Sequence, residues 1–67
     1  MTTITTTAKV ITVKEDIEAV IGQLKNTFVR ANEVYYSSSS YGNGAGWHDK
    51  SKIVILTAHI VMLTPTG

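Results

Sequence analysis

The sequence predicts a small α+β domain in which one helix packs on one face of a three-stranded, mostly antiparallel sheet. Three observations favour this fold class. β-Branched residues crowd the first 13 positions, apolar residues recur at spacings of three and four over residues 14–30, and an apolar run fills residues 52–63. The expected element order is β-α-β-β, the expected strand order is 1-3-2, and all 67 residues belong to one domain.

The first strand is expected within residues 2–13. Threonine, isoleucine and valine dominate this stretch, and they favour a pleated surface because rotation about χ1 is restricted. Ile4, Ala8 and Val10 would share one face of such a strand, with threonines on the other. A polar face of this kind is typical of an antiparallel edge strand with one side in water.

A helix is expected over residues 14–30. Thr12 is placed to cap its N-terminus, and Glu15 follows three residues later to complete a capping box. Acidic residues gather near the expected start and basic residues near the expected end, which suits the helix dipole. The apolar stripe consists of Ile17, Val20, Ile21, Leu24, Phe28 and Ala31.

Two further strands are expected after the helix. The second begins at Val34 and ends in a run of four serines, and the third spans the apolar residues 52–63. Because both faces of the third strand are apolar, we expect it in the middle of the sheet, with a bend near residues 57–59. A single helix would leave the other sheet face bare, which predicts a homo-oligomer that covers this face.

Composition excludes several classes of protein. A chain of 67 residues buries little core, and the absence of cysteine removes disulfides and thiolate zinc sites. With two histidines, neither a metal site nor a cofactor is expected. The net charge of +1 argues against duplex nucleic acid as a partner. We expect a cytoplasmic protein without membrane contact, since the sequence shows no secretory signal and no apolar run approaching 18 residues.

The candidate site lies in residues 35–52, YYSSSSYGNGAGWHDKSK, which hold all three tyrosines and the only tryptophan. Aromatic rings offer faces for stacking, serine hydroxyls and glycine amides offer small donors, and the basic residues offer positive charge. This combination matches a phosphate-bearing aromatic ligand such as a nucleotide. The candidate ligand-binding residues are Tyr35, Tyr36, Tyr41, Gly44, Trp47, His48, Lys50 and Lys52.

The same segment is also consistent with the tip of a hairpin. The stretch G-N-G-A-G is neither the dinucleotide-binding fingerprint nor a P-loop. Asn43-Gly44 favours a type I′ turn, around which residues 37–41 would pair with residues 47–52. Ordering residues 37–50 would cost on the order of 15–25 kcal/mol of backbone entropy, so a mobile tip is the alternative to a binding loop.

No catalytic residues are predicted, and we expect a protein that is not an enzyme. His48 and Asp49 are adjacent, so in a strand their side chains point to opposite faces and do not form a triad with a serine. Three functions remain open. The first is a homo-oligomer that sequesters a nucleotide-like anionic small molecule. The second is an inhibitor or adaptor that docks a protein through the aromatic loop or a sheet edge. The third, single-stranded nucleic-acid binding, is disfavoured by the low basic count.

Overall fold

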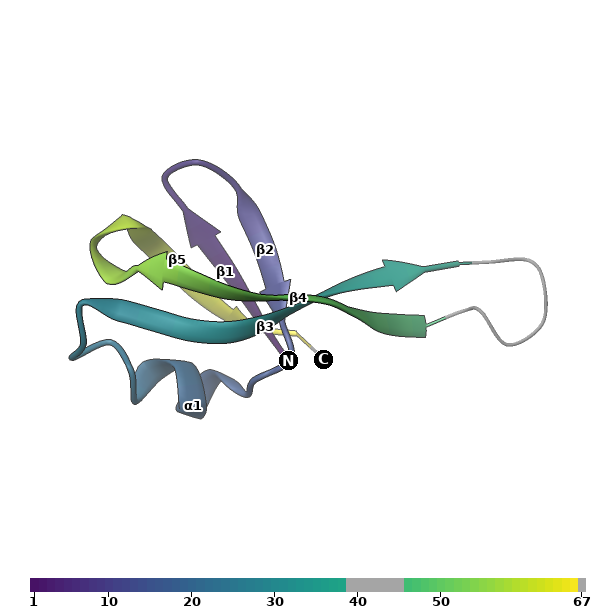
Figure 1. The fold of residues 1–67 in the computed structure, drawn as a ribbon, viewed down its shortest axis with the longest axis horizontal. Coiled ribbons are helices and arrows are strands. Elements are labelled where there is room, and N and C mark those ends of the chain that lie inside the picture. The colour runs from purple at the N-terminus through teal and green to yellow at the C-terminus, as the bar shows by residue number, and fades with distance from the viewer. Residues whose placement is uncertain (39–45, 67) are drawn as a thin grey trace.

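The computed structural model describes residues 1–38 and 46–66, which form one five-stranded antiparallel sheet and one short helix (Figure 1). The strand order is β4-β3-β2-β1-β5. The expected three-stranded sheet of order 1-3-2, with one helix packed on a face, is therefore wrong. The elements are β1 (Thr2–Thr6), β2 (Val10–Val13), α1 (Ile17–Ile21), β3 (Phe28–Ser37), β4 (Gly46–Leu56), the 3₁₀ turn η2 (Thr57–His59) and β5 (Ile60–Pro65).

The expected first strand is in fact a hairpin of β1 and β2. Thr6 makes the turn, because its hydroxyl donates to the Lys9 carbonyl (2.9 Å) and accepts from the amides of Ala8 (3.2 Å) and Lys9 (3.1 Å). The reversal separates two residues that were expected on one face. Ile4 is fully buried opposite Ile11, whereas Val10 is 62% exposed.

The helix is much shorter than expected, and β3 begins within its expected span. From Phe28 onward, burial alternates: Val29 and Ala31 are buried, while Phe28 and Arg30 are exposed. Apolar residues at positions 28 and 31 continue a helical stripe, yet the intervening Val29 makes a strand of period two equally consistent with the sequence. Packing of Val29 and Ala31 into the core decides for the strand.

The predicted capping box is also wrong. Thr12 lies within β2, and the residue at the helix N-cap is Asp16, which makes no side-chain capping bond. Glu15 instead reaches across to β3, where its carboxylate accepts hydrogen bonds from the Asn32 amide (2.9 Å) and from Asn32 Nδ2 (2.6 Å). The side chain that was expected to start the helix therefore ties the connecting segment to the sheet.

Gln23 makes a second tie of this kind along the edge of β3. β2 pairs with β3 only through Val13–Glu33 and its neighbour Thr12–Val34, which leaves the first half of that edge without a strand. There, Gln23 Nε2 donates to the Arg30 carbonyl (2.9 Å) and Gln23 Oε1 accepts from the Arg30 amide (2.8 Å). The side-chain amide thus takes the place of a neighbouring strand and satisfies both backbone groups.

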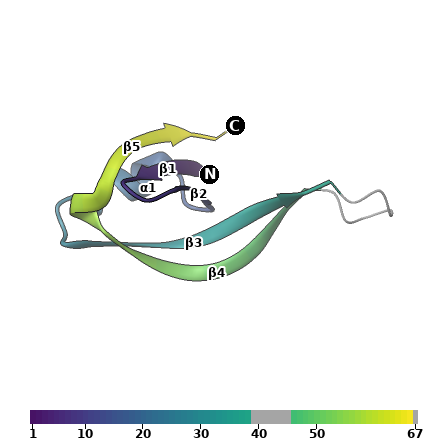
Figure 2. The ribbon, with the colours of Figure 1, turned by 90° about the horizontal axis from the view of Figure 1, so that it is seen from above.

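The sheet must curl strongly, because two strands that follow each other in the chain form its two opposite edges. β4 and β5 are joined only by η2, yet they are the first and last strands in the sheet order. Figure 2 shows them diverging from η2 on either side of β1 and β2. The expected bend near residues 57–59 is confirmed, but its two flanks are edge strands, not one central strand.

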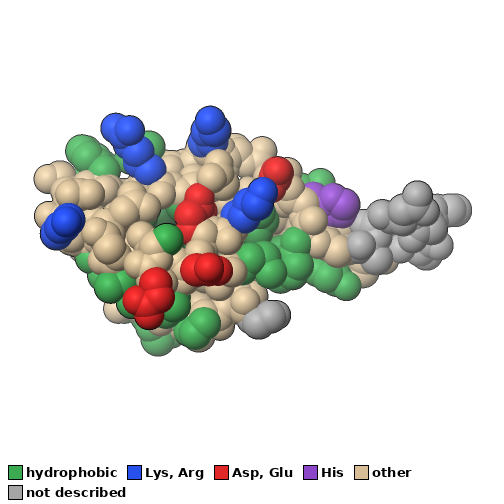
Figure 3. Space-filling view, turned by 90° about the horizontal axis from the view of Figure 1, so that it is seen from below, with side chains coloured by type: hydrophobic (Ala, Val, Ile, Leu, Met, Phe, Trp, Pro, Cys, Tyr) green, Lys and Arg blue, Asp and Glu red, His purple; other side chains and the backbone are tan. Residues whose placement is uncertain are grey.

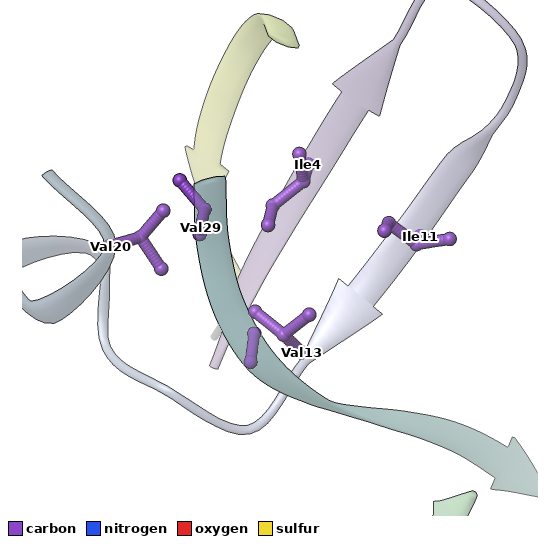
Figure 4. Close-up of a cluster of buried hydrophobic side chains, with 6 residues drawn as sticks. Ile4, Ile11, Val13, Val20 and Val29 are labelled. Carbon is purple, nitrogen blue, oxygen red and sulfur yellow. The ribbon is translucent and has the colours of Figure 1, made fainter. Parts of the chain in front are cut away.

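The curled sheet encloses the hydrophobic core (Figure 4). α1 contributes Val20, which is fully buried and points toward Val29 of β3. The homo-oligomer was expected because one helix would leave the other face of the sheet bare. The curled sheet covers its own inner face, so this reason no longer holds. The core residues are Ile4, Ile11, Val13, Val20, Val29 and Ala31, with Ile53, Ile55, Ile60 and Leu63 packed against them.

Within residues 1–38 and 46–66, no helix has the length and apolar character that a membrane-crossing helix needs.

Candidate functional site

The β3–β4 hairpin extends beyond the rest of the sheet as a two-stranded arm, here defined as residues 35–38 and 46–48 (Figures 1 and 2). The last pairing of β3 with β2 is Val34 opposite Thr12. Past this point β3 pairs with β4 alone, through Ser37 opposite Gly46 at the end of the ladder. The hairpin was expected, but its register was wrong, because Trp47 pairs with Tyr36 and not within residues 37–41.

Two cross-strand aromatic pairs stabilise the arm, one on each face. Tyr36 contacts Trp47 edge-to-face, with ring centroids 5.5 Å apart and planes at 73°. Tyr35 contacts His48 at 5.5 Å with planes at 34°. Each aromatic pair of this kind contributes about 0.5–1.5 kcal/mol. Because successive residues of a strand point to opposite faces, the two pairs lie on opposite sides of the ribbon.

These rings remain largely in contact with solvent. Tyr36 is 59% exposed, Tyr35 48% and Trp47 42%, although large aromatic side chains usually lie inside a small domain. The core of this protein is aliphatic, and the arm carries its aromatic side chains outside that core. In Figure 3, apolar side chains gather where the arm leaves the body, next to a histidine.

A β-bulge marks the junction of arm and body. Glu33 lies opposite Ser51 and Val34 opposite Asp49, so Lys50 is the extra residue in β4. Lys50 Nζ lies 3.6 Å from the Glu33 carboxylate. This partly exposed ion pair contributes less than about 1 kcal/mol, but it directs the Lys50 charge toward Glu33 and away from the aromatic pairs.

One face of the hairpin forms a continuous series of side chains, which we call the outer ladder. Its members alternate with the buried Val29 and Ala31, so over the body they face outward, although Val34 is itself buried. Apolar or aromatic residues lie at both ends, and each of the three pairs between them contains at least one polar or charged residue. The cross-strand pairs are Phe28–Leu56, Arg30–Val54, Asn32–Lys52, Val34–Asp49 and Tyr36–Trp47.

Three shallow hollows follow one another along the outer ladder. The first, of about 410 Å³, lies at Arg30 and Val54, and shares Asn32 and Lys52 with the second, of about 300 Å³. The third, of about 560 Å³, shares residues with the second and reaches Trp47. Because neighbouring hollows share lining residues, we call the three together the trough. The side chains shared by the second and third hollows are Lys14 and Asp49.

The carboxyl of Glu15 lies at the border of this trough. Burial alone would raise its pKa, but the hydrogen bonds from the Asn32 amide and side chain, together with the nearby charge of Lys14, lower the pKa below its ordinary value. Glu15 is therefore ionised at neutral pH, and its carboxylate accepts two hydrogen bonds from Asn32. Its role at this site is structural.

The predicted site residues do not form one cluster. Tyr36 and Trp47 share one face of the arm, Tyr35 and His48 share the other, and Lys50 and Lys52 lie further along β4 toward the body. Tyr41 and Gly44, together with the turn predicted at Asn43-Gly44, lie outside the described residues. No group of three histidine or carboxylate side chains in the described part of the chain is arranged to hold a metal ion.

Sequence reasoning did not identify the residues of the body that line the trough. Lys14, Arg30, Asn32 and Val54 line the trough. Lys14 and Arg30 were assigned to a helix, Asn32 to the residues that end it, and Val54 to a buried strand. The alternation of apolar and polar residues over residues 29–32 was the signal that could have located Arg30 and Asn32.

Comparison of the chain with protein-family models, with curated proteins and with solved structures found no match.

Proposed function

We propose that this protein is a non-enzymatic binding protein that docks a protein partner through the arm, as an inhibitor or adaptor does. The observation that supports this proposal is the pair of exposed aromatic contacts, Tyr36–Trp47 and Tyr35–His48, on the two faces of a projecting ribbon. Tyrosine and tryptophan are over-represented among the residues that dominate binding energy at protein interfaces. Rings already held by cross-strand contacts lose little conformational entropy when they bind.

The shape of the surface favours a protein partner over a small molecule. Small-molecule sites are concave and usually bury 70–90% or more of the ligand. The three hollows are open and shallow. Two of them lie on the body, and the third reaches the arm at Trp47 and His48. A projecting ribbon can enter a cleft of a partner or lie along its surface, and both of its aromatic faces are then used.

A nucleotide-like anionic small molecule is the second candidate ligand. The hollow at the base of the arm brings Trp47, His48 and Lys14 together in about 560 Å³. This set offers a ring for stacking, an imidazole and a cation, which suits a phosphate-bearing aromatic ligand. Asp49 lines the same hollow and opposes the phosphate charge, so we rank this candidate second.

The test uses the intrinsic fluorescence of Trp47, which reports on the arm directly because the chain has a single tryptophan. Immobilised wild type and the Tyr36→Ala/Trp47→Ala double variant are compared in cell extract, and the captured protein is then purified. The affinity of the purified partner is measured by calorimetry for the wild type and for the double variant, and by Trp47 fluorescence for the wild type. The matched control is Val61→Ala/Met62→Ala in β5, where 66% and 56% of the side chains are exposed.

Saturable binding of the purified partner that weakens at least about 30-fold in the arm variant, and is unchanged in the β5 control, supports the proposal. Equal binding by the wild type and the arm variant would overturn it. A saturable change of Trp47 fluorescence with nucleotides, without any protein partner that depends on the arm, would favour the second candidate.

A further inference from the structure

We propose that the partner supplies an extended acidic segment that lies in the trough of the outer ladder, with an apolar residue against Tyr36 and Trp47. This inference rests on the proposed function and adds the chemistry of the partner. Its basis is the distribution of charge along the trough, the length of the trough and the aromatic pair at one end.

Three cations border the trough and do not form a salt bridge there. Lys14, Arg30 and Lys52 line the hollows, and none of them forms a salt bridge within the described part of the chain. Their charges therefore face solvent along one side of the hairpin. A ligand that carries carboxylates would find three attractive positions in a row.

Of the three carboxylates that line the trough, only Glu33 is paired with a cation. Glu15 binds Asn32, and Glu33 forms the ion pair with Lys50. Asp49 is the acidic lining residue that makes no hydrogen bond or salt bridge among the described residues. Because Asn32 is neutral, Glu15 keeps its charge. The side chains that line the three hollows therefore carry a small positive excess, four cations (Lys14, Arg30, Lys50 and Lys52) against three carboxylates (Glu15, Glu33 and Asp49).

The trough fits an extended chain. From the Arg30–Val54 pair to the Tyr36–Trp47 pair is six residues of β3, about 20 Å at about 3.3 Å per residue. An extended peptide of about six residues spans the same distance. The hollows are too open to enclose a folded element, and an extended segment contacts all three of them in sequence.

A peptide fits this charge pattern better than a single strand of nucleic acid does. Asp49 lies between Lys52 and Trp47 along the ladder, where a continuous row of phosphates would be repelled. A peptide can meet Asp49 with a backbone amide or a basic side chain. The edge-to-face contact of Tyr36 with Trp47 also occupies one of the ring faces that base stacking would use.

The experiment uses three probes on the intact protein. They are an eight-residue peptide of alternating glutamate and valine ending in leucine, the same peptide with lysine for glutamate, and a thymidine octanucleotide. Binding is followed through Trp47 fluorescence at low and moderate salt. We expect saturable binding of the acidic peptide that weakens as salt rises, and no binding of the lysine peptide.

Charge reversal locates the contact. Arg30→Glu/Lys52→Glu should weaken binding of the acidic peptide by about tenfold. The matched control, Lys9→Glu/Lys25→Glu, changes the net charge equally, but Lys9 lies in the β1–β2 turn and Lys25 follows α1, both outside the trough. This control should leave affinity within about twofold. Circular dichroism melts establish that all variants are folded.

The inference is overturned if the acidic peptide does not bind at millimolar concentration, if both charge variants weaken it equally, or if the octanucleotide binds more tightly. Its failure is distinguishable from failure of the proposed function. A captured partner that responds to Tyr36→Ala/Trp47→Ala but not to Arg30→Glu/Lys52→Glu would leave the arm proposal standing and refute the trough. A partner that responds to neither would refute both.

Discussion

Substitution of Glu15 tests how the connecting segment is held on the edge of β3. The Glu15 carboxylate accepts hydrogen bonds from the Asn32 backbone amide at 2.9 Å and from Asn32 Nδ2 at 2.6 Å. The Thr2 hydroxyl donates to the Glu15 backbone carbonyl at 2.8 Å. Glu15→Gln keeps the shape of the side chain but places an NH₂ group where one carboxylate oxygen accepts. One hydrogen bond is then lost, and the remaining one has a neutral amide oxygen as its acceptor instead of a charged carboxylate.

The expected loss follows from these two contacts. A hydrogen bond to a charged group contributes about 1.5–3 kcal/mol when it is shielded from water. Glu15 is only partly buried, so solvent screening reduces this value. We expect Glu15→Gln to lower the free energy of unfolding by about 1–2 kcal/mol at pH 7, and the melting temperature by about 5–10 °C.

The pH dependence has a defined sign. Burial alone would raise the pKa of Glu15, but the hydrogen bonds from Asn32 and the charge of Lys14 lower it below the ordinary value of 4.5. Because the folded-state pKa is the lower one, the stabilisation is fully present above pH 4.5 and disappears as pH falls through the folded-state pKa. The wild type should therefore lose more stability on acidification than Glu15→Gln does.

Urea unfolding followed by circular dichroism from pH 7 to pH 3 measures this difference. Glu18→Gln is the control, since Glu18 is an exposed carboxylate of α1. Equal stability of wild type and Glu15→Gln at pH 7 would refute the reasoning. A stability difference that stays constant down to pH 3 would refute the assigned pKa direction.

Three further predictions concern the body of the protein. Gln23→Ala removes both hydrogen bonds to the Arg30 backbone, and urea unfolding should show a loss of about 1–2 kcal/mol; no loss would mean that water replaces them at no cost. Val20→Ala leaves a cavity between α1 and the sheet and should cost about 2–3 kcal/mol in the same assay, whereas a change below about 0.5 kcal/mol would show that α1 is dispensable. We also expect self-association through exposed apolar residues outside the trough such as Val10, so light scattering should give a mass above that of one chain and Val10→Lys should lower it. A monomer at all concentrations would contradict this.

The aromatic surface shows how far sequence reasoning reached toward the site. Composition located the aromatic residues in one segment, because Tyr35, Tyr36 and Trp47 lie close together in the chain. It did not separate them onto two faces, since that depends on the pairing of Tyr36 with Trp47. This register is established by the bulge at Lys50, for which the sequence carries no glycine or proline signal.

The sequence by itself determined the local features of the fold. It indicated β structure near the N-terminus, a hairpin after Val34 and a break at residues 57–59, because side-chain propensity and strand length act over a few residues. It did not reveal the turn at residues 7–9, because this turn contains neither glycine nor asparagine and is stabilised by hydrogen bonds of the Thr6 hydroxyl.

Only the tertiary structure decided between helix and strand for residues 28–31, and it thereby decided the shape of the sheet. Phe28 and Ala31 fit both periods, so local pattern left the choice open. Burial of Val29 and Ala31 against β1, β2 and α1 favours the strand, and contacts between residues distant in the chain supply that burial. The same choice places Arg30 on the outer ladder, so the trough exists because the core required β3 to be a strand.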